Sequence, residues 1–190
     1  MTASATLTRA AISPRALHAG LDRLDTARLR LERPAPEHLP GFVDFLGSAR
    51  ADALGWKRPP EEATAFWNLH LAHWAERGFG WFVLIDRDAA RPLGMCGPWA
   101  PAHLPEGELA WSLWDAGDEG RGLAFEAASA ARAHAFGALG WRTAVSYVAP
   151  DNHRSASLAT RLDARRDGVW RTAKGKTVHV YRHAAPEATR

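Results

Sequence analysis

The sequence contains little cysteine, little lysine and no long apolar run. The single cysteine, Cys96, excludes a disulfide framework or a multi-cysteine zinc site within one chain. No segment approaches the roughly 20 apolar residues that a membrane-spanning helix needs, so we expect no membrane association. Arginine supplies nearly all the positive charge. The net charge of +3 arises from interspersed acidic and basic residues without a basic stripe or tail, which argues against a nucleic-acid partner.

The composition is that of a globular protein of one domain. Hydrophobic residues make up 46% and charged residues 24% of the 190-residue chain. Residues 1–21 contain no acidic residue, and we interpret them as an N-terminal extension with a short helix near Pro14 to Leu17. A single domain is expected to occupy residues 22–190.

Hydrophobic periodicity predicts an alternating order of strands and helices. Gly78 and Gly137 are expected to end two of the helices, and Asp151 to cap a third. Strands are predicted at 27–32, 80–86, 92–99, 108–115, 143–148, 169–170 and 177–181, and helices at 37–46, 60–77, 120–137 and 151–164. This order predicts one α+β domain with a mixed sheet flanked by helices.

The most informative segment is a glycine-containing loop between the strand at 108–115 and the following helix. A helix start leaves several backbone N–H groups without partners, and the positive end of the helix dipole lies behind them. Gly120 and Gly122 would allow a pyrophosphate to approach this backbone, and Arg121 could add positive charge.

Other interpretations of the glycines were compared. A dinucleotide-binding GxGxxG motif would need glycine or alanine at position 125, where the sequence has Phe125. Gly175-Lys176-Thr177 looks like the end of a P-loop, but Trp170 occupies the position of the first glycine and no helix is expected to follow. A glycine-tolerant helix start without any ligand remains an open alternative for the loop itself.

The segment from Gly120 to Ala127 resembles the acetyl-CoA pyrophosphate loop of the GNAT superfamily of N-acetyltransferases. The family pattern, Gln/Arg-x-x-Gly-x-Gly/Ala, maps here to Glu119, Gly122 and Ala124. The segments 25–31, 75–80 and 150–155 are similar to the first strand, the entry to the second strand and the Pro-x-Asn-x-x-Ser motif of the RimJ/RimL-like branch. The resemblance spans residues 22–182 and implies a three-layer fold with a mostly antiparallel central sheet.

Two departures from the family pattern bear on the cofactor site. Glu119 stands where the family has glutamine or arginine, and a carboxylate there would repel a pyrophosphate unless it points away. Leu162-Asp163-Ala164 replaces the family's Leu-Gly-Phe after the last helix, which affects part of the expected acyl-CoA pocket.

The resemblance implies roles for two catalytic residues. Glu108 takes the position of the general-base glutamate, although a surface carboxylate on the strand is an equally good interpretation. Ala159 occupies the place of the tyrosine that many GNAT enzymes use, so Ser155 is the candidate for stabilising or protonating the leaving thiolate. The alternative for Ser155 is a serine on the helix surface.

The resemblance also implies the acetyl-CoA contacts. Asn152 would bond the pantetheine amides or, alternatively, serve as a second capping residue. Backbone N–H groups of the strand would stabilise the oxyanion. The expected cofactor-binding residues are Ser112, Leu113, Trp114, Glu119, Gly120, Arg121, Gly122, Leu123, Ala124 and Asn152. No metal ion is expected.

Several conspicuous residues are not expected to be catalytic. His70 and His73 could share a metal by spacing, but two ligands without a third rarely suffice, so a structural or cleft role is favoured. His134 and Cys96 are expected to be packed in the core. Trp56 and Trp99 are expected to line the acceptor side.

The sequence thus favours an acetyl-CoA-dependent N-acetyltransferase that acts on a primary amine, either a protein N-terminus or a small molecule. A catalytically weak acyl-CoA-binding regulatory module is the alternative, favoured by Glu119 and the missing Leu-Gly-Phe. We further expect a cytoplasmic location and a possible homodimer.

Overall fold

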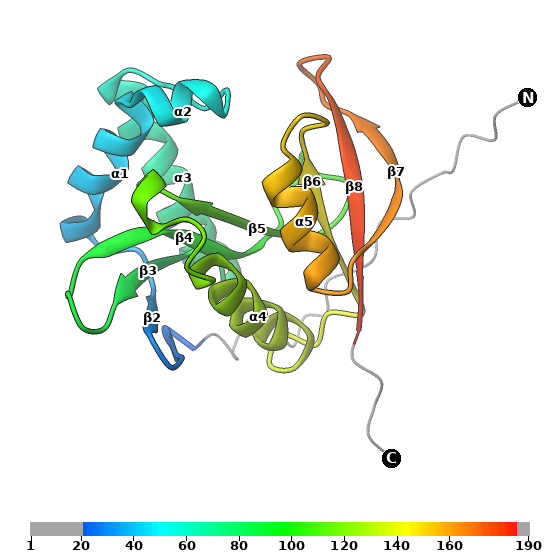
Figure 1. The fold of residues 1–190 in the computed structure, drawn as a ribbon, viewed down its shortest axis with the longest axis horizontal. Coiled ribbons are helices and arrows are strands. Elements are labelled where there is room, and N and C mark those ends of the chain that lie inside the picture. The colour runs from blue at the N-terminus through cyan, green and yellow to red at the C-terminus, as the bar shows by residue number, and fades with distance from the viewer. Residues whose placement is uncertain (1–20, 186–190) are drawn as a thin grey trace, which may run out of the picture.

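An eight-stranded sheet crosses the molecule in the order β1-β2-β3-β4-β5-β6-β8-β7 (Figure 1). The computed structural model describes residues 21–185, so the predicted helix near residues 14–17 lies outside them. Neighbouring strands are antiparallel except β5 and β6, which are parallel, and the predicted mixed, mostly antiparallel sheet is therefore confirmed. The strands are β1 (Arg23–Asp25), β2 (Leu29–Glu32), β3 (Phe82–Asp86), β4 (Pro92–Trp99), β5 (Glu108–Leu113), β6 (Thr143–Val148), β7 (Arg165–Arg171) and β8 (Thr177–Ala184).

Helices cover both faces of the sheet and give the three layers that were expected (Figure 1). The alternation of β3 shows how, because successive strand residues point to opposite faces. Phe82 and Leu84 pack with α4 and α5, whereas Val83 and Ile85 pack with α1, α2 and α3. The helices are α1 (Leu39–Gly47), α2 (Ala49–Ala53), α3 (Pro60–Arg77), α4 (Leu123–Phe136) and α5 (His153–Arg161), with short 3-10 turns at Pro36–His38 and Ala116–Asp118.

Most element boundaries agree with the predicted ones, and two N-terminal elements were missed. The strand expected at 27–32 begins at Leu29 and pairs with the additional strand β1. Helix α2 was not predicted because five residues are too few for an apolar period. Its signal is Ser48, whose hydroxyl accepts a hydrogen bond from the backbone N–H of Ala51 at 3.2 Å.

Two helix starts differ from the prediction for local reasons. Helix α4 begins at Leu123 and not at Gly120, because Gly120 and Gly122 have φ angles of +73° and +77°. The prediction that Asp151 caps α5 is wrong. Asn152 is the cap, since its side-chain oxygen accepts the backbone N–H of Ser155 at 3.0 Å.

The sheet splits between its two central strands. Within residues 21–185, β5 and β6 are paired in register at Glu108 and Val145 alone. Beyond that pair the strands diverge, which leaves β1–β5 on one side and β6–β8 on the other (Figure 1). The candidate site lies in this split.

Candidate active site

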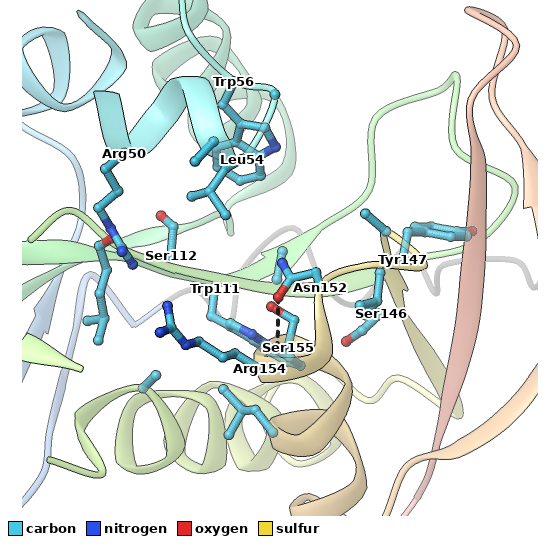
Figure 2. Close-up of a pocket in the computed structure, with 18 of the residues that line it drawn as sticks. Arg50, Leu54, Trp56, Trp111, Ser112, Ser146, Tyr147, Asn152, Arg154 and Ser155 are labelled. Atoms are coloured by element: carbon cyan, nitrogen blue, oxygen red, sulfur yellow. Dashed lines mark hydrogen bonds between the residues drawn. The ribbon is translucent and has the colours of Figure 1, made fainter. Parts of the chain in front are cut away.

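A cavity of about 2100 Å³ occupies the split between β5 and β6. Its walls come from β5, from α2 and the loop after it, from the loop before α4, and from α5 (Figure 2). Trp56 and Leu54 lie across the cavity from Asn152 and Ser155 (Figure 2). Residues from four separate parts of the sequence therefore meet around one space.

Side chains replace the backbone hydrogen bonds where the two strands separate. The N–H of Val145 still donates to the carbonyl of Gly107 at 3.0 Å, as in a regular parallel ladder. The next carbonyl, that of Leu109, accepts the hydroxyl of Ser146 at 2.5 Å instead. The backbone N–H of Tyr147 donates to the Glu108 carboxylate. The opening is thus built into the strands, and side chains take over some of the hydrogen bonds that the ladder loses.

Glu108 lines the cavity at the point where the strands separate. Burial disfavours its charged form and raises its pKa to about 7, although the hydrogen bond from Tyr147 acts in the opposite direction. A carboxylate with a pKa near neutrality can accept a proton and still be substantially ionised at pH 7. Glu108 can therefore serve as a base, as was expected.

Backbone donors on β5 face the cavity at alternate residues. The N–H of Trp114 donates to Leu93 on β4 at 2.8 Å, and the alternation of an antiparallel ladder directs the N–H of Ser112 to the same side. Leu113 faces the split instead, where its carbonyl accepts a hydrogen bond from Arg50 at 2.8 Å. Among Ser112, Leu113 and Trp114, the expected cofactor-binding residues of this strand, Leu113 is the one whose backbone N–H is directed toward the cavity.

Trp114 is a correction to the expected cofactor contacts. Its indole stacks on Phe45 with ring centroids 6.2 Å apart and lies 6.0 Å from Phe42, in the layer formed by α1. The backbone N–H is already bonded within the sheet, and the side chain does not line the cavity. Ser112 and Leu113 do line it.

The loop before α4 has the geometry of an anion site. The left-handed conformations of Gly120 and Gly122 turn the chain so that α4 starts at Leu123 with its first N–H groups beside the cavity. Such groups and the helix dipole together favour a phosphate. The expected positions Gly120, Gly122, Leu123 and Ala124 all line the cavity, so the loop fits the pyrophosphate of CoA.

Arg121 does not add its charge to that site. Its guanidinium lies 2.8 Å from Asp118, which is 2% exposed and also forms a two-bond pair with Arg91 at 2.6 and 2.9 Å. The buried carboxylate of Asp118 thus holds both guanidinium groups. Arg121 is therefore a structural residue that fixes the loop, and the prediction of a direct charge contact with phosphate is wrong.

Glu119 is neutralised by two arginines that the sequence did not single out. Its carboxylate lies 2.5 Å from Arg50 of α2 and 2.8 Å from Arg154 of α5. Arg50 and Arg154 approach the same space from opposite walls (Figure 2). Glu119 is therefore compensated, and the cluster of Glu119, Arg50 and Arg154 carries a net positive charge.

Asn152 and Ser155 face the cavity from the first turn of α5 (Figure 2). The side-chain oxygen of Asn152 is occupied by the cap hydrogen bond, which fixes the orientation of its amide. Its NH₂ group remains able to donate to a pantetheine carbonyl. Asn152 is therefore the cap of α5, and its NH₂ group is left facing the cavity.

A family model described as an acetyltransferase (GNAT) domain matches residues 28–165. The chain belongs to the GNAT acetyltransferase family. An acetyltransferase structure from Agrobacterium tumefaciens str. C58 is similar, with 33% identity and a TM-score of 0.78 over 86% of this chain and 94% of that chain. The expected GNAT membership and fold are confirmed. The protein is an acetyl-CoA-dependent N-acetyltransferase.

Two ribosomal-protein acetyltransferases share the fold at lower sequence identity. One is the ribosomal-protein-alanine acetyltransferase of Vibrio fischeri, with 16% identity and a TM-score of 0.69 over 88% of this chain and 99% of that chain. The other is RimL in complex with coenzyme A, with 17% identity and a TM-score of 0.69 over 84% and 95%.

The segment after α5 keeps a glycine-like turn without the GNAT glycine. Asp163, where the family has glycine, adopts a φ of +61°. Aspartate tolerates this left-handed conformation better than most residues. The N–H of Ala164 then donates to the carbonyl of Ala159 at 3.0 Å, which closes the end of the helix. The departure from Leu-Gly-Phe therefore preserves the turn.

The tyrosine of this GNAT cavity does not replace the one missing at Ala159. Tyr147 lines the cavity, but its ring is directed away from Ser155 (Figure 2) and packs on Trp170 with centroids 5.0 Å apart. Burial raises the pKa of the Tyr147 phenol, which disfavours its ionised form. Ser155 remains the candidate for the thiolate partner.

The conspicuous histidines are part of the packed interior. His73 bonds the carbonyl of Phe79 at 2.8 Å and accepts the N–H of Ala100 at 3.2 Å, which uses both ring nitrogens. His70 is fully buried, and burial lowers its pKa to about 3. His134 is also buried. The structural roles expected for these residues are confirmed.

Cys96 is buried as expected, and burial raises the pKa of its thiol.

In residues 21–185, no group of three His, Cys, Asp or Glu side chains is arranged to hold a metal ion. None of the helices in the same residues is long and apolar enough to cross a membrane.

Proposed function

We propose that this enzyme transfers the acetyl group of acetyl-CoA to a primary amine by direct attack on the thioester, in the manner of the RimJ/RimL-like branch. The observation that carries the proposal is the position of Glu108, a carboxylate with a pKa of about 7 in the split beside the phosphate loop. The acceptor is either a protein N-terminus, as the name of the RimL alpha-N-protein acetyltransferase says of that enzyme, or a small molecule.

The chemistry requires one proton to leave the acceptor and one to reach the sulfur. Glu108 removes a proton from the ammonium, directly or through water, because a free amine has a pKa near ~10. The amine nitrogen then forms a bond to the thioester carbon, and the backbone N–H of Leu113 stabilises the negative charge on the oxygen. The carbon–sulfur bond breaks as Ser155 donates a hydrogen bond or a proton to the departing thiolate.

The remaining predicted residues hold the substrate for this reaction. Backbone N–H groups from Gly120 to Ala124 bind the pyrophosphate, and Arg50 and Arg154 add the positive charge that Arg121 does not supply. The free NH₂ of Asn152 bonds a pantetheine carbonyl. In this proposal the thioester lies at Leu113, which lines the same cavity as Glu108.

A regulatory acyl-CoA-binding module is the weaker alternative. Its main support was an uncompensated Glu119, and the ion pairs with Arg50 and Arg154 remove that support. The turn at Asp163 removes the second argument. The division between an extension and a domain at residue 22, the cytoplasmic location and the homodimer stay predictions.

Amine-dependent release of CoA thiol tests the proposal. Acetyl-CoA is incubated with the protein and a panel of small amines and peptides, and the products are identified by mass spectrometry. We expect thiol release and acetylated product only with an acceptor present, and a loss of both in Glu108→Gln. Tight CoA binding without transfer to any acceptor would support the regulatory module instead.

A further inference from the structure

The half of the cavity on the α2 and α3 side is lined by apolar side chains that water can reach. The large hydrophobic residues exposed within residues 21–185 are Leu21, Leu54, Leu69 and Val169. Two of these four, Leu54 and Leu69, are 37% and 60% exposed and line this cavity. Exposed aliphatic side chains that gather at one cavity wall are typical of a surface that binds an apolar ligand.

Aromatic rings form the wall behind these leucines. Trp56 stacks on Trp81 with centroids 6.0 Å apart and planes 19° from parallel, and Trp81 lies 5.9 Å from Trp99. All three tryptophans line the cavity, together with Phe66. Because several of these rings pack on one another and on the buried His70, the wall is held in place before a ligand arrives.

The charges on this side do not favour a polycationic acceptor. His70 behind the wall is neutral at pH 7, because burial lowers its pKa to about 3. Asp52 and Glu108 line this side, but so do Arg58 and Lys176. A second ammonium group on the acceptor would therefore meet no excess of negative charge.

We infer that the acceptor is a primary amine bearing one bulky apolar group, preferably aromatic, and no second positive charge. The apolar group would lie between Trp56 and Leu69, and its amine would reach Glu108. The inference rests on the proposed function, since it assigns the acceptor of the same site. The same chemistry can come from a free arylalkylamine or from a peptide whose first residue is aromatic.

Steady-state kinetics with matched acceptors test the inference. The free-amine arm compares 2-phenylethylamine with propylamine and spermidine, and the peptide arm compares otherwise identical peptides that begin with phenylalanine or serine. We expect kcat/KM to favour the aromatic member by about 10–100-fold in at least one arm, as a filled apolar pocket does. The arm with the larger kcat/KM shows whether the acceptor is a free arylalkylamine or a peptide with an aromatic first residue. Equal or better turnover of propylamine, spermidine and the serine peptide would overturn the inference.

Two substitutions with equal exposure supply a matched control. Leu69 and Val169 are both 60% exposed, but Val169 lies on β7 outside the cavity lining. Leu69→Ser should lower kcat/KM for 2-phenylethylamine several-fold and spare propylamine, whereas Val169→Ser should change neither. Trp56→Ala should cause a larger loss while CoA affinity is kept, which reports that the variant is folded. Equal effects of the variants on both amines would contradict the assignment.

Calorimetry of 2-phenylethylamine with the CoA-saturated protein separates this inference from the proposed function. Binding that exceeds propylamine binding and weakens in Leu69→Ser would support the apolar pocket even if no acetyl transfer occurred. Transfer to amines without any aromatic preference would leave the proposed function intact and overturn the inference.

Discussion

At the residue scale, the charge of Glu119 depends on partners that are distant in the sequence. Arg50 and Arg154 come from helices on opposite walls of the cavity, yet both contact this carboxylate. Arg50 is also fixed by the Leu113 carbonyl, whereas the Arg154 side chain is 81% exposed and free to reorient. Arg154 can therefore be replaced without breaking the contact between Arg50 and β5.

Removing Arg154 should weaken CoA binding, and removing Glu119 as well should restore part of the loss. Arg154→Gln removes one positive charge, so the cluster of Arg50 and Glu119 that remains near the phosphates is neutral. We expect a several-fold loss of affinity at low salt, kept small because the pair is exposed. Titration calorimetry of CoA with wild type, Arg154→Gln and Glu119→Gln/Arg154→Gln measures this. A double variant that binds no better than Arg154→Gln would contradict the proposed charge balance.

The sequence allowed Glu108, Asn152 and Ser155 to be predicted because each belongs to a short motif. Arg50 belongs to none. Its relevance arises from a contact with Glu119 that spans 69 positions, and from a five-residue helix that has no apolar period of its own. The misassigned role of Arg121 has the same cause, since its partner Asp118 is buried by the fold and not by any local pattern.

At the element scale, the turn before α4 combines backbone conformation with binding. Gly122 has a φ of +77°, and a side chain there would point toward Arg28 at 3.5 Å from the added Cβ. Gly140, between α4 and β6, has a similar φ of +66° but nothing within 4 Å and no place in the cavity lining. A side chain would therefore cause similar backbone strain at either glycine, but only Gly122 lies at the proposed phosphate site.

Gly122→Glu should abolish CoA binding, because it places a carboxylate and a side chain where the phosphates approach the backbone. Gly140→Glu carries the matching conformational strain and should leave CoA affinity near that of wild type. Calorimetry at equal protein concentration compares them, with circular dichroism to establish folding. Undiminished CoA affinity in a folded Gly122→Glu variant would show that the loop is not the site.

Asn152 can be divided into its two roles by two substitutions. Asn152→Asp keeps an oxygen for the Ser155 N–H but loses the NH₂ group, so thermal stability should hold while CoA affinity falls. Asn152→Ala should lose both, with about 1 kcal/mol of stability removed by the missing cap. Thermal unfolding and calorimetry on both variants check this. The idea fails if the aspartate variant binds CoA as wild type does.

Element boundaries were predictable to the extent that local chemistry sets them. The strands Pro92–Trp99 and Thr143–Val148 and the helix ending before Gly78 follow from apolar runs and a left-handed glycine at φ +71°. The start of α5 was misplaced because two adjacent residues, Asp151 and Asn152, are both capable caps. The choice between them is made by the geometry of the preceding turn.

At the scale of the whole molecule, the decisive feature is the separation of β5 from β6. The order of elements predicted the mixed sheet, but not where it opens. The opening depends on Ser146 bonding Leu109 and on Tyr147 bonding Glu108, contacts between residues 37 or more positions apart that no periodic pattern reveals.

Burial of Glu108 in this split should make global stability depend on pH. The carboxyl has a pKa near 7 when folded and an ordinary value of 4.5 otherwise. Below about pH 4.5 it is protonated in both states. As the pH rises from about 4.5 to about 7, the carboxyl ionises in the unfolded state but not in the folded state, so stability is lost, on the order of 3 kcal/mol at about 1.4 kcal/mol per pKa unit.

Urea unfolding of wild type and Glu108→Gln at several pH values measures this effect. The free energy of unfolding of wild type should fall relative to that of the variant between about pH 4.5 and pH 7 and should level off above that range. A constant difference across that range would mean that the carboxyl titrates normally in the folded protein.

The most direct test of the account is the ratio of kcat for wild type to kcat for Glu108→Gln as a function of pH. Losing a general base costs ~10²–10⁴-fold near neutrality, and the ratio should shrink as the pH approaches the pKa of the acceptor amine, where deprotonation needs no help. Ser155→Ala should give a smaller ratio that does not shrink, because the leaving thiol has a pKa near ~8.5 and needs less assistance. A pH-independent ratio for Glu108→Gln would contradict its role as the base and assign it to substrate positioning.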